Sequence, residues 1–386
     1  MRVLDINNLY SPTGGGIRIY HHEKLKWCKT NGIENLLLYP SSKNTTISVN
    51  GGTVTGLKSP KLRRSGYNFF TARKPIIETI KEFDPDIAEL GSGMILPCMV
   101  KGVLKEMNTP SFAYFHSNWP ETLPMSVLGI NKGIISKLFK RMTEPIMRKA
   151  YKPLNGVMAA SDYSIKKLTE AGLTRLHKIP LGTNPDIFHP SKRSEELRRS
   201  LGISRSGKMI LYMGRLAPEK GIHVLLKACN RLFKHKDLVV VVAGGGHWDK
   251  KVKQMAGLNP DKMKILDRIT GRAQAAELMA SADVFVSAGP LETFSLVTLE
   301  ALSCGTPVAA CSKAAAAELI TKAGGNSTYT PWDSGEALAE AVLNAASNHK
   351  SQRDNFRNFA EKYTWDTCFT KLFNAYNSNK TFNCTG

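Results

Sequence analysis

The chain has 386 residues, 42% of them hydrophobic, and 53 Lys plus Arg against 32 Asp plus Glu give a formal net charge of +21. This length and composition exclude a largely disordered chain and indicate two globular domains. Residues 1–190 carry 26 basic and 14 acidic side chains (+12), and residues 191–386 carry 27 and 18 (+9). The excess is therefore not concentrated in one basic arm of the kind that binds nucleic acid.

The first half alternates short apolar runs with helical stretches, a pattern typical of βα units in a parallel sheet. Strands are predicted at Val3–Ile6, Leu36–Tyr39, Asp86–Leu90, Phe112–Phe115 and Val157–Ala160. Helices are predicted at Ile17–Thr30 and at Tyr163–Ala171, the second capped by Ser161. Residues 180–205 interrupt the pattern with prolines, glycines and charges, and they predict a linker.

A second series of βα units follows the linker. Its predicted strands are Met209–Met213, Leu238–Ala243, Met263–Leu266, Val284–Ser287 and Pro307–Ala310. Its predicted helices are Ile222–Lys236, Arg272–Ala280, Phe294–Ser303, Ala314–Thr321 and Gly335–Ser347, before a helical tail over Ser351–Asn377. Two doubly wound α/β domains predict a ligand-binding cleft at the carboxyl ends of both sheets.

Two glycine-rich loops follow strands in this scheme. Gly14, Gly15 and Gly16 precede the first helix, where backbone N–H groups can approach a phosphate, although a tight turn explains them equally well. Gly244–Gly246 fits a turn better than a binding loop. Neither loop has GxGxxG spacing, which disfavours a dinucleotide-dependent dehydrogenase.

The charged residues of the second domain suggest an anion site. Arg215 and Lys220 lie five residues apart in a loop between a strand and a helix, a placement that suits a diphosphate leaving group. Glu292 precedes the predicted helix Phe294–Ser303, and Glu300 lies within that helix, whose other residues are mostly apolar. A carboxylate in such a helix requires a partner, and sugar hydroxyls are one candidate, with surface exposure as the other.

Several motifs together resemble the retaining glycosyltransferases of family 4. They are GRLAPEKG at 214–221, E-x7-E from Glu292 to Glu300, SPTGGGIR at 11–18, FHSNW at 115–119, PLGTN at 180–184 and Thr364-Trp365-Asp366. The resemblance implies the GT-B fold, with two Rossmann-like doubly wound domains facing a central cleft. It implies an acceptor-side domain over 1–190, a nucleotide-sugar domain over 191–362, and a helix over 363–386 that crosses back to the first domain.

The same resemblance implies roles for individual residues. Arg215 and Lys220 would hold the donor diphosphate and Glu292 the donor sugar, aided by backbone N–H groups near Phe294, Ser295 and Leu296. Glu300 would bind the ribose hydroxyls. Gly15 and Gly16 would approach the donor or acceptor from the first domain, and His116 would lie near the transferred sugar. Departures from the family pattern are Ser295 in place of a Gly and an Ala-rich segment over 314–317, both on the sugar side.

The resemblance therefore implies an enzyme that moves a hexose from a UDP- or GDP-sugar to a glycan or lipid-linked acceptor, with retention and with no cofactor or metal. Asp84-Pro-Asp86 matches a metal motif of another glycosyltransferase fold but leads into an apolar strand. The alternatives are a GT-B-fold epimerase or phosphorylase and, third, a basic nucleic-acid-binding protein. The last lacks zinc-ligand spacing and an aromatic platform.

The sequence also bears on the compartment in which the protein acts. Residues 1–7 lack the apolar stretch of a signal peptide, and seven cysteines without CxxC spacing predict reduced core thiols in a cytoplasmic protein. Two segments, 58–74 and 134–147, combine basic and apolar residues. In the second, Leu138, Met142 and Ile146 share one predicted face, opposite Lys140 and Arg141. Such a helix either packs on a core or lies on the inner, anionic face of a membrane.

Overall fold

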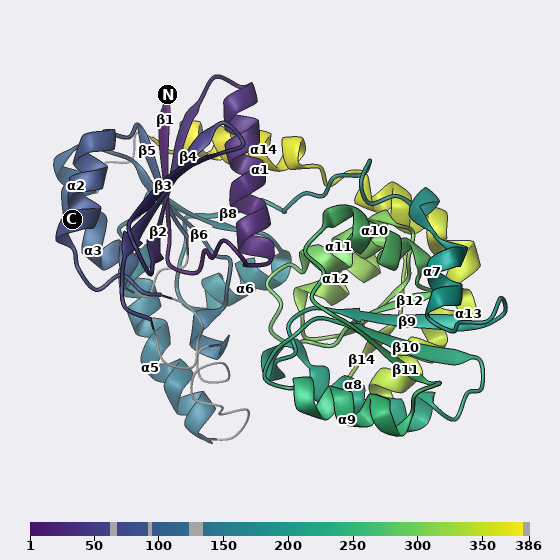
Figure 1. Ribbon diagram of the computed structural model, residues 1–386. Helices are drawn as coiled ribbons and strands as arrows, with labels where there is room; N and C mark the ends of the chain where they lie inside the picture. Colours follow the sequence, from purple (N-terminus) through teal and green to yellow (C-terminus); the bar gives the residue numbers. More distant parts are fainter. Residues whose placement is uncertain (62–67, 92–94, 123–133, 381–386) are drawn as a thin grey trace. The chain divides into compact units, whose positions relative to one another are not determined.

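The computed structural model describes residues 1–61, 68–91, 95–122 and 134–380 (Figure 1). The chain forms two compact units, which are treated separately below. Unit 1 comprises Met1–Leu181 with Trp365–Gly386, and unit 2 comprises Gly182–Thr364. The sequence places the corresponding boundaries at 190/191, within a 3₁₀ turn at Pro190–Lys192, and at 362/363, between α13 (Gly335–Ala360) and α14 (Trp365–Ser378).

Unit 1 is an eight-stranded sheet in the order β3-β4-β2-β1-β5-β6-β7-β8, parallel except for the antiparallel β3–β4 pair. The strands are β1 Arg2–Asn7, β2 Glu34–Ser41, β3 Thr45–Val49, β4 Gly52–Lys58, β5 Ile87–Gly91, β6 Ser111–Tyr114, β7 Gly156–Ala159 and β8 Leu176–Lys178. Its helices are α1 Gly16–Thr30, α2 Lys74–Phe83, α3 Leu96–Glu106, α5 Ile134–Tyr151, α6 Asp162–Glu170 and α14 Trp365–Ser378.

The sheet of unit 1 is covered on both faces, which explains its nearly continuous apolar strands. Leu4 and Ile6 of β1 point toward the core that also contains residues of α2 and α3. Leu37 of β2 and Leu25 of α1 belong to the second, smaller core on the other face. Asp5 lies between Leu4 and Ile6, so the alternation of a strand directs its carboxylate toward the α1 side.

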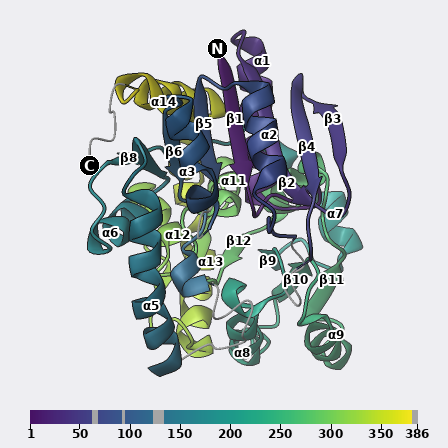
Figure 2. The same cartoon turned by 90° about the vertical axis from the view of Figure 1, so that its left-hand side faces the viewer.

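The carboxy-terminal helix α14 belongs to unit 1, although some 180 residues of unit 2 precede it. Figure 2 draws α14 in yellow among the elements of unit 1. The helix contacts α1, and the rings of Trp27 and Phe373 lie 4.9 Å apart there. The Trp27 indole also donates a 2.9 Å hydrogen bond to Asp366 at the start of α14. The helix that the family resemblance implies over 363–386 is observed as α14 at Trp365–Ser378, and it contacts helix α1 near the start of the chain.

Unit 2 is a six-stranded parallel sheet in the order β11-β10-β9-β12-β13-β14. The strands are β9 Lys208–Met213, β10 Leu238–Ala243, β11 Met263–Leu266, β12 Val284–Ser287, β13 Val308–Cys311 and β14 Thr328–Tyr329. The α-helices are α7 Glu195–Ser200, α8 Ile222–Leu232, α9 Asp249–Leu258, α10 Arg272–Ser281, α11 Leu296–Ser303, α12 Ala315–Lys322 and α13 Gly335–Ala360.

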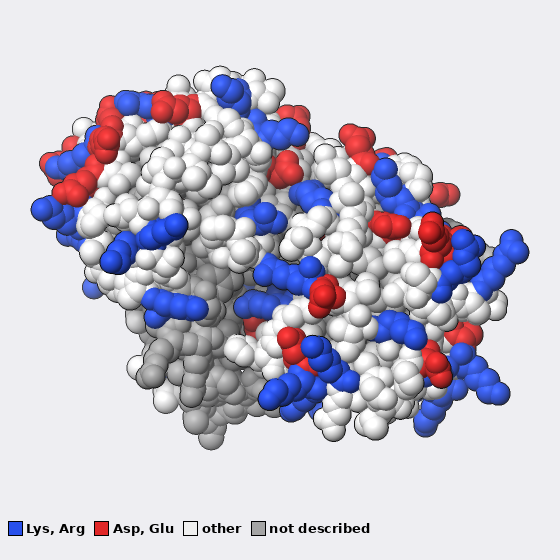
Figure 3. Space-filling model, viewed as in Figure 1, with Lys and Arg blue, Asp and Glu red and all other residues white. Residues whose placement is uncertain are grey.

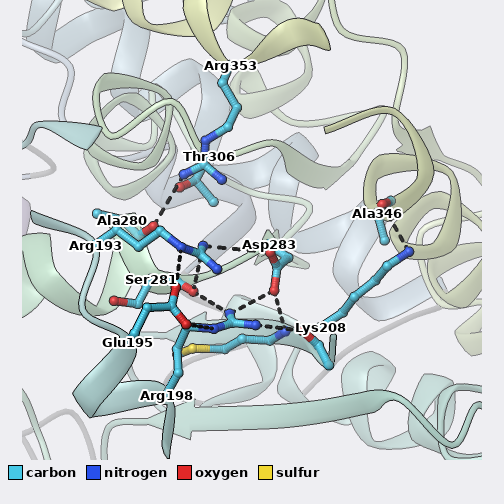
Figure 4. A network of polar contacts seen from close by, with 12 residues as sticks. Arg193, Glu195, Arg198, Lys208, Ala280, Ser281, Asp283, Thr306, Ala346 and Arg353 are labelled. Atoms are coloured by element: carbon cyan, nitrogen blue, oxygen red, sulfur yellow. Dashed lines mark hydrogen bonds and ion pairs between the residues drawn. The ribbon is translucent and has the colours of Figure 1, made fainter. Parts of the chain in front are cut away.

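The segment predicted as a linker is partly built into unit 2 (Figure 4). Arg198 of α7 is 1% exposed, and its guanidinium donates to the Ser281 carbonyl at 2.7 Å and to Asp283 Oδ2 at 2.8 Å. Asp283 also accepts a 2.8 Å hydrogen bond from the backbone N–H of Met209. The linker prediction is wrong for residues 190–200 because the charges there serve a buried ion pair at the amino ends of β9 and β12.

On the face shown in Figure 3, basic side chains occur on both units and are interspersed with acidic ones, so the positive charge forms no single block there.

The cysteines of the described residues are all free thiols. Cys98 is exposed, and the others are buried: Cys28, Cys229, Cys304, Cys311 and Cys368. Within the described residues, no helix combines the length and apolarity needed to cross a bilayer.

Candidate functional site

The loop Gly214–Gly221 connects β9 to α8 at the carboxyl edge of the sheet of unit 2, as predicted. It contains a turn of 3₁₀-helix at Pro218–Lys220 and ends at Gly221, whose φ is 72°. A Cβ on Gly221 would lie 2.3 Å from the carbonyl oxygen of Ala288. Glycine is required there because both the left-handed backbone and the close approach exclude a side chain.

Each cation of this loop already has a carboxylate partner. Arg215 Nη2 lies 3.1 Å from Glu219 Oε1, and Lys220 Nζ lies 2.6 Å from Glu292 Oε1. The side chains of Arg215 and Lys220 are 49% and 35% exposed, whereas those of Glu219 and Glu292 are 8% and 17% exposed. The four charges cancel while both cations remain accessible. An incoming anion can therefore bind by taking the cations over from the carboxylates.

Tyr212 of β9 ties the two ends of this loop together. Its hydroxyl is the donor to the carbonyl oxygens of Arg215, at 2.9 Å, and Lys220, at 3.4 Å. Burial raises the pKa of Tyr212, and the carboxylates of Glu292 and Glu219 raise it further. The hydroxyl thus stays protonated and fixes the backbone at the two residues that carry the cations.

The second glycine loop, Gly244–Gly246, supports the first. A Cβ on Gly244 would meet the Gly214 carbonyl oxygen at 1.9 Å, and one on Gly246 would meet the Leu216 carbonyl oxygen at 2.6 Å. The backbone N–H of Leu216 donates to the carbonyl of Gly245 at 3.0 Å. This geometry agrees with the turn interpretation, since the glycines permit two loops to pack against each other.

The segment from Glu292 to the start of α11 contains the residues that the family resemblance assigns to the donor sugar. Phe294, Ser295 and Leu296 are all buried, and Ser295 has a left-handed φ of 76° at the N-cap of α11. Its hydroxyl lies 2.8 Å from that of Thr298. A non-glycine residue in this conformation stores backbone strain, which is common at functional sites. The carbonyl of Glu292 accepts from the backbone N–H of Ala315 at 3.1 Å, which links this segment to α12.

Glu300 is buried rather than exposed on a turn. It is 4% exposed within α11, and its Oε1 lies 3.9 Å from Arg272 Nη2 of α10. The structure therefore supplies a cationic partner for the carboxylate inside the protein. This contact explains why a charge is tolerated in an apolar helix.

In unit 1, the predicted residues lie at the carboxyl ends of β1 and β6. Gly15 is the N-cap of α1, and Gly16 is its first residue; both are exposed. His116 follows β6, where its ring stacks 4.3 Å from Tyr114 and meets the edge of Tyr20 at 4.7 Å. Burial lowers the pKa of His116 well below its usual value, and electrostatic interactions with His21 and Lys24 lower it further. The imidazole is therefore neutral near pH 7.

A buried ionic network lies behind His116. Lys24 of α1 donates to Asp5 Oδ1 at 2.6 Å and to Glu89 Oε2 at 3.1 Å, and all three side chains are fully buried. Tyr20 donates to Glu89 at 2.8 Å, and Tyr376 of α14 donates to the same oxygen. The network joins β1, β5, α1 and α14, and Tyr20 connects it to His116.

Two groups of acidic residues bear on metal binding. Asp5, His21 and Glu89 place potential ligand atoms within 4.8 Å of one another, but the Lys24 ammonium donates to both carboxylates and already occupies oxygens that a metal ion would need. Asp84 accepts from the Arg2 guanidinium at 2.6 Å, and Asp86 accepts from the Arg2 backbone N–H at 2.6 Å. In both groups the carboxylates therefore already have hydrogen-bond donors from the protein itself.

The structure thus brings together Arg215, Lys220 and Glu292 within unit 2 and places Gly15, Gly16 and His116 on unit 1. The sequence did not indicate Glu219, Tyr212 or the Asp5–Lys24–Glu89 network. Asp5 and Glu89 carry a usable signal, because each is a carboxylate inside an apolar strand. The roles of Glu219 and Tyr212 depend on contacts that no motif spacing reveals.

The fold is that of a protein with two α/β units built on largely parallel sheets, and sequence comparison identifies the family. The model "Glycosyltransferase Family 4" matches residues 14–187, and "Glycosyl transferases group 1" matches residues 193–363. The two matches cover consecutive parts of the chain, so most of it is accounted for. The chain belongs to the family 4 glycosyltransferases.

Relatives agree with this assignment, and a solved structure agrees with the fold. A GDP-mannose-dependent alpha-mannosyltransferase of Corynebacterium glutamicum is 24% identical over 97% of this chain and 88% of the relative. A GDP-mannose-dependent alpha-(1-6)-phosphatidylinositol dimannoside mannosyltransferase of Mycobacterium tuberculosis is 25% identical over 95% and 93%. Sucrose-phosphate synthase from Thermosynechococcus elongatus superposes with a TM-score of 0.79 at 16% identity and 98% coverage of both chains.

The protein is therefore a glycosyltransferase with the GT-B fold. None of the relatives named above is an epimerase, a phosphorylase or a nucleic-acid-binding protein, and the alternatives from the sequence gain no support from these comparisons.

Proposed function

We propose that this glycosyltransferase moves a hexose from a nucleotide-diphosphate sugar to a glycan or lipid-linked acceptor, with retention of anomeric configuration and without a metal ion. The observation that carries the proposal is the pair of accessible cations, Arg215 and Lys220, in one rigid loop beside Glu292. A diphosphate leaving group gains negative charge as the glycosidic bond breaks. Two fixed cations stabilise that charge in the transition state.

The local ion pairs suggest how donor binding and chemistry are coupled. The diphosphate takes Lys220 from Glu292 and Arg215 from Glu219, because each phosphate oxygen offers a competing charge-assisted hydrogen bond. Glu292 is then released and can accept hydrogen bonds from the sugar hydroxyls. Its exposure of 17% makes this exchange sterically accessible from the solvent side.

Retention is proposed to follow a front-face course. The diphosphate departs, an oxocarbenium-like species forms, and the acceptor hydroxyl attacks from the face that the leaving group vacates. A departing phosphate oxygen accepts the acceptor's proton. In this scheme, neutral His116 orients hydroxyl groups through hydrogen bonds, a role that its lowered pKa suits better than that of a cationic acid.

The choice of donor and acceptor rests on the relatives. Two of them are described as GDP-mannose-dependent mannosyltransferases, and the phosphatidylinositol dimannoside of the second is a lipid acceptor. GDP-mannose is therefore the donor to test first. Ser295 and the alanines over 314–317, which replace the usual glycines on the sugar side, are the positions where a different preference would arise.

The test is a calorimetric panel of GDP-, UDP- and ADP-sugars, followed by assays of transfer and of slow donor hydrolysis with the sugar that binds. Arg215→Ala and Lys220→Ala are each expected to lower kcat/KM about 100-fold or more, as the loss of an oxyanion-type contact does. NMR of the product gives the anomeric configuration, and chelator treatment tests metal independence. Unchanged turnover in both variants would exclude the proposed site.

A further inference from the structure

Helix α5 (Ile134–Tyr151) has one face buried in unit 1. Thr143, Met147, Ala150 and Tyr151 are each at most 6% exposed and form its inner face. Lys140 is also directed inward, where its ammonium lies 3.0 Å from Glu121 and 3.4 Å from Glu144. The inner face of α5 therefore supplies the contacts described here between the helix and the rest of unit 1.

The opposite side of α5 carries exposed apolar residues. Leu138, Met142 and Ile146 are 54%, 63% and 47% exposed. They are spaced four residues apart, so they form one stripe along about 12 Å of the helix. The core-packing alternative for these three residues is wrong, because the inner face falls on Thr143, Met147 and Ala150 instead. The stripe is exposed, and the buried cluster of unit 1 that contains Met147, Ala150 and Tyr151 does not include it.

The charges beside this stripe have one sign. The exposed charged side chains of the described part of α5 are Arg141, Arg148 and Lys149, and none of them has an ion-pair partner among the described residues. The described part of α5 contains one acidic residue, Glu144, which is half-buried and forms an ion pair with Lys140. Arg141 is exposed and lies three residues after Leu138, on the same side of the helix, so its predicted place opposite the stripe is wrong. We call the following residues the outer face of α5: Leu138, Arg141, Met142, Ile146, Arg148 and Lys149.

We propose that the outer face of α5 docks on the surface of an anionic lipid bilayer. Leucine, methionine and isoleucine side chains at helical spacing enter the boundary of the acyl chains, while adjacent Arg and Lys side chains remain at the anionic headgroups. The net charge of +21 attracts the whole protein to such a surface. Because no described helix can cross a bilayer, the association is peripheral and reversible.

The composition of the outer face favours lipid over nucleic acid. Its apolar members are aliphatic, and they offer no aromatic ring for base stacking. The second basic segment, 58–74, adds nothing to this argument because residues 62–67 lie outside the described part of the chain. The inference does not depend on the proposed reaction, since a bilayer can be bound whether or not the donor site turns over.

Flotation of the full-length protein with phosphatidylcholine vesicles, with and without phosphatidylglycerol, tests the proposal. We expect flotation with the anionic vesicles at low salt and its loss at about 1 M salt, where the Debye length is about 3 Å. The variant L138S/M142S/I146S removes the stripe, and R141E/R148E/K149E reverses the flanking charge. Each triple variant is expected to weaken binding about tenfold or more.

Matched variants control for composition and charge. I47S/L258S removes two other exposed apolar side chains, which are 54% and 75% exposed, and K101E/K105E/K166E reverses three exposed lysines of α3 and α6. We expect the apolar control to float like the parent and the charge control to lose less binding than R141E/R148E/K149E. Thermal unfolding and donor hydrolysis should be unchanged in the α5 variants.

Three results would overturn the proposal. They are an absence of flotation with anionic vesicles, equal flotation of the parent and both α5 variants, and binding to neutral vesicles that neither salt nor the variants alter. A gel-shift assay with RNA tests whether the outer face of α5 binds nucleic acid instead. If the α5 variants lose RNA binding but keep flotation, the outer face binds nucleic acid and the membrane assignment is wrong.

Discussion

The Lys220 ammonium and the Glu292 carboxylate, 72 residues apart in sequence, are joined by a hydrogen bond of 2.6 Å in unit 2. The pair has two consequences. It holds Glu292 at the edge of α11, and it reduces the positive charge that an anion meets at Lys220. A ligand carrying both a diphosphate and a sugar offers a partner to each member, whereas a nucleoside diphosphate without a sugar offers one only to Lys220.

The first prediction separates these two effects with Glu292→Gln. The variant keeps the side-chain volume but removes the charge that competes for Lys220, so a nucleoside diphosphate should bind about fivefold more tightly, near the upper range for a partly exposed ion pair. Transfer from the complete donor should fall about 100-fold or more, because the sugar loses a charged acceptor. Calorimetry and initial rates measure the two quantities.

Glu336→Gln is the matched control for this prediction. Glu336 also forms a short ion pair in unit 2, with Arg231 at 2.5 Å, but it lies at the start of α13. Its loss should leave nucleoside diphosphate affinity unchanged. Equal affinities in the parent and Glu292→Gln would mean that the ion pair does not compete with the diphosphate.

The second prediction concerns Tyr212 as a positioning residue. Tyr212→Phe removes the hydroxyl that holds the carbonyls of Arg215 and Lys220 and leaves the ring in place. We expect a loss of about 1 kcal/mol in the free energy of unfolding. We also expect about a tenfold lower kcat/KM, expressed mainly as a higher KM for the donor because the two cations are less well placed.

Thr306→Val provides the structural comparison. Thr306 donates from its buried hydroxyl to the Met279 carbonyl at 2.7 Å, at the amino end of β13, so its loss should cost similar stability. Its donor KM should remain that of the parent. If the two variants change KM alike, Tyr212 has only a structural role.

The sequence predicted the main architecture because the strands buried in these sheets are apolar runs with few interruptions. Val3–Ile6 and Leu238–Ala243 are examples, and both are fully buried. The β3–β4 hairpin was missed since β3 is mostly exposed and its Thr- and Ser-rich sequence lacks a clear alternation. The short β14 was missed because two residues carry no periodicity.

Some features of the candidate site could likewise be predicted from the sequence, and others could not. Arg215 and Lys220 were predicted because a loop between a strand and a helix fixes their region from local sequence alone. Their pairing with Glu219 and Glu292 was not predicted, because it depends on side-chain directions set by Tyr212 and by packing. Helix α5 shows the same limit: its period groups Leu138 with Met142, but only the fold reveals that this face is exposed.

The third prediction tests the buried network of unit 1. Lys24→Met should lower the free energy of unfolding by about 3–5 kcal/mol, because Asp5 and Glu89 would remain buried without their cation. Lys81→Met, which breaks an exposed pair with Glu106 at 3.6 Å, should cost at most about 1 kcal/mol. Denaturant unfolding measures both values, and comparable losses would show that the network is not a major source of stability.

The fourth prediction follows from the lowered pKa of His116. Burial keeps this imidazole neutral in the folded protein, whereas an unfolded chain takes up a proton below about pH 6.5. The free energy of unfolding should therefore decrease as the pH falls below about 6.5, by at most about 1.4 kcal/mol per pH unit from this one residue.

His116→Gln removes that contribution, so the difference between parent and variant should change between pH 7.5 and 5.5 in favour of the variant. His22 has a pKa lowered in the same direction but is only half-buried, so His22→Gln should give a weaker effect of the same sign. Urea unfolding at three pH values measures the difference. A stability offset that is independent of pH would contradict the neutral state assigned to His116, and with it the hydrogen-bonding role proposed for that residue.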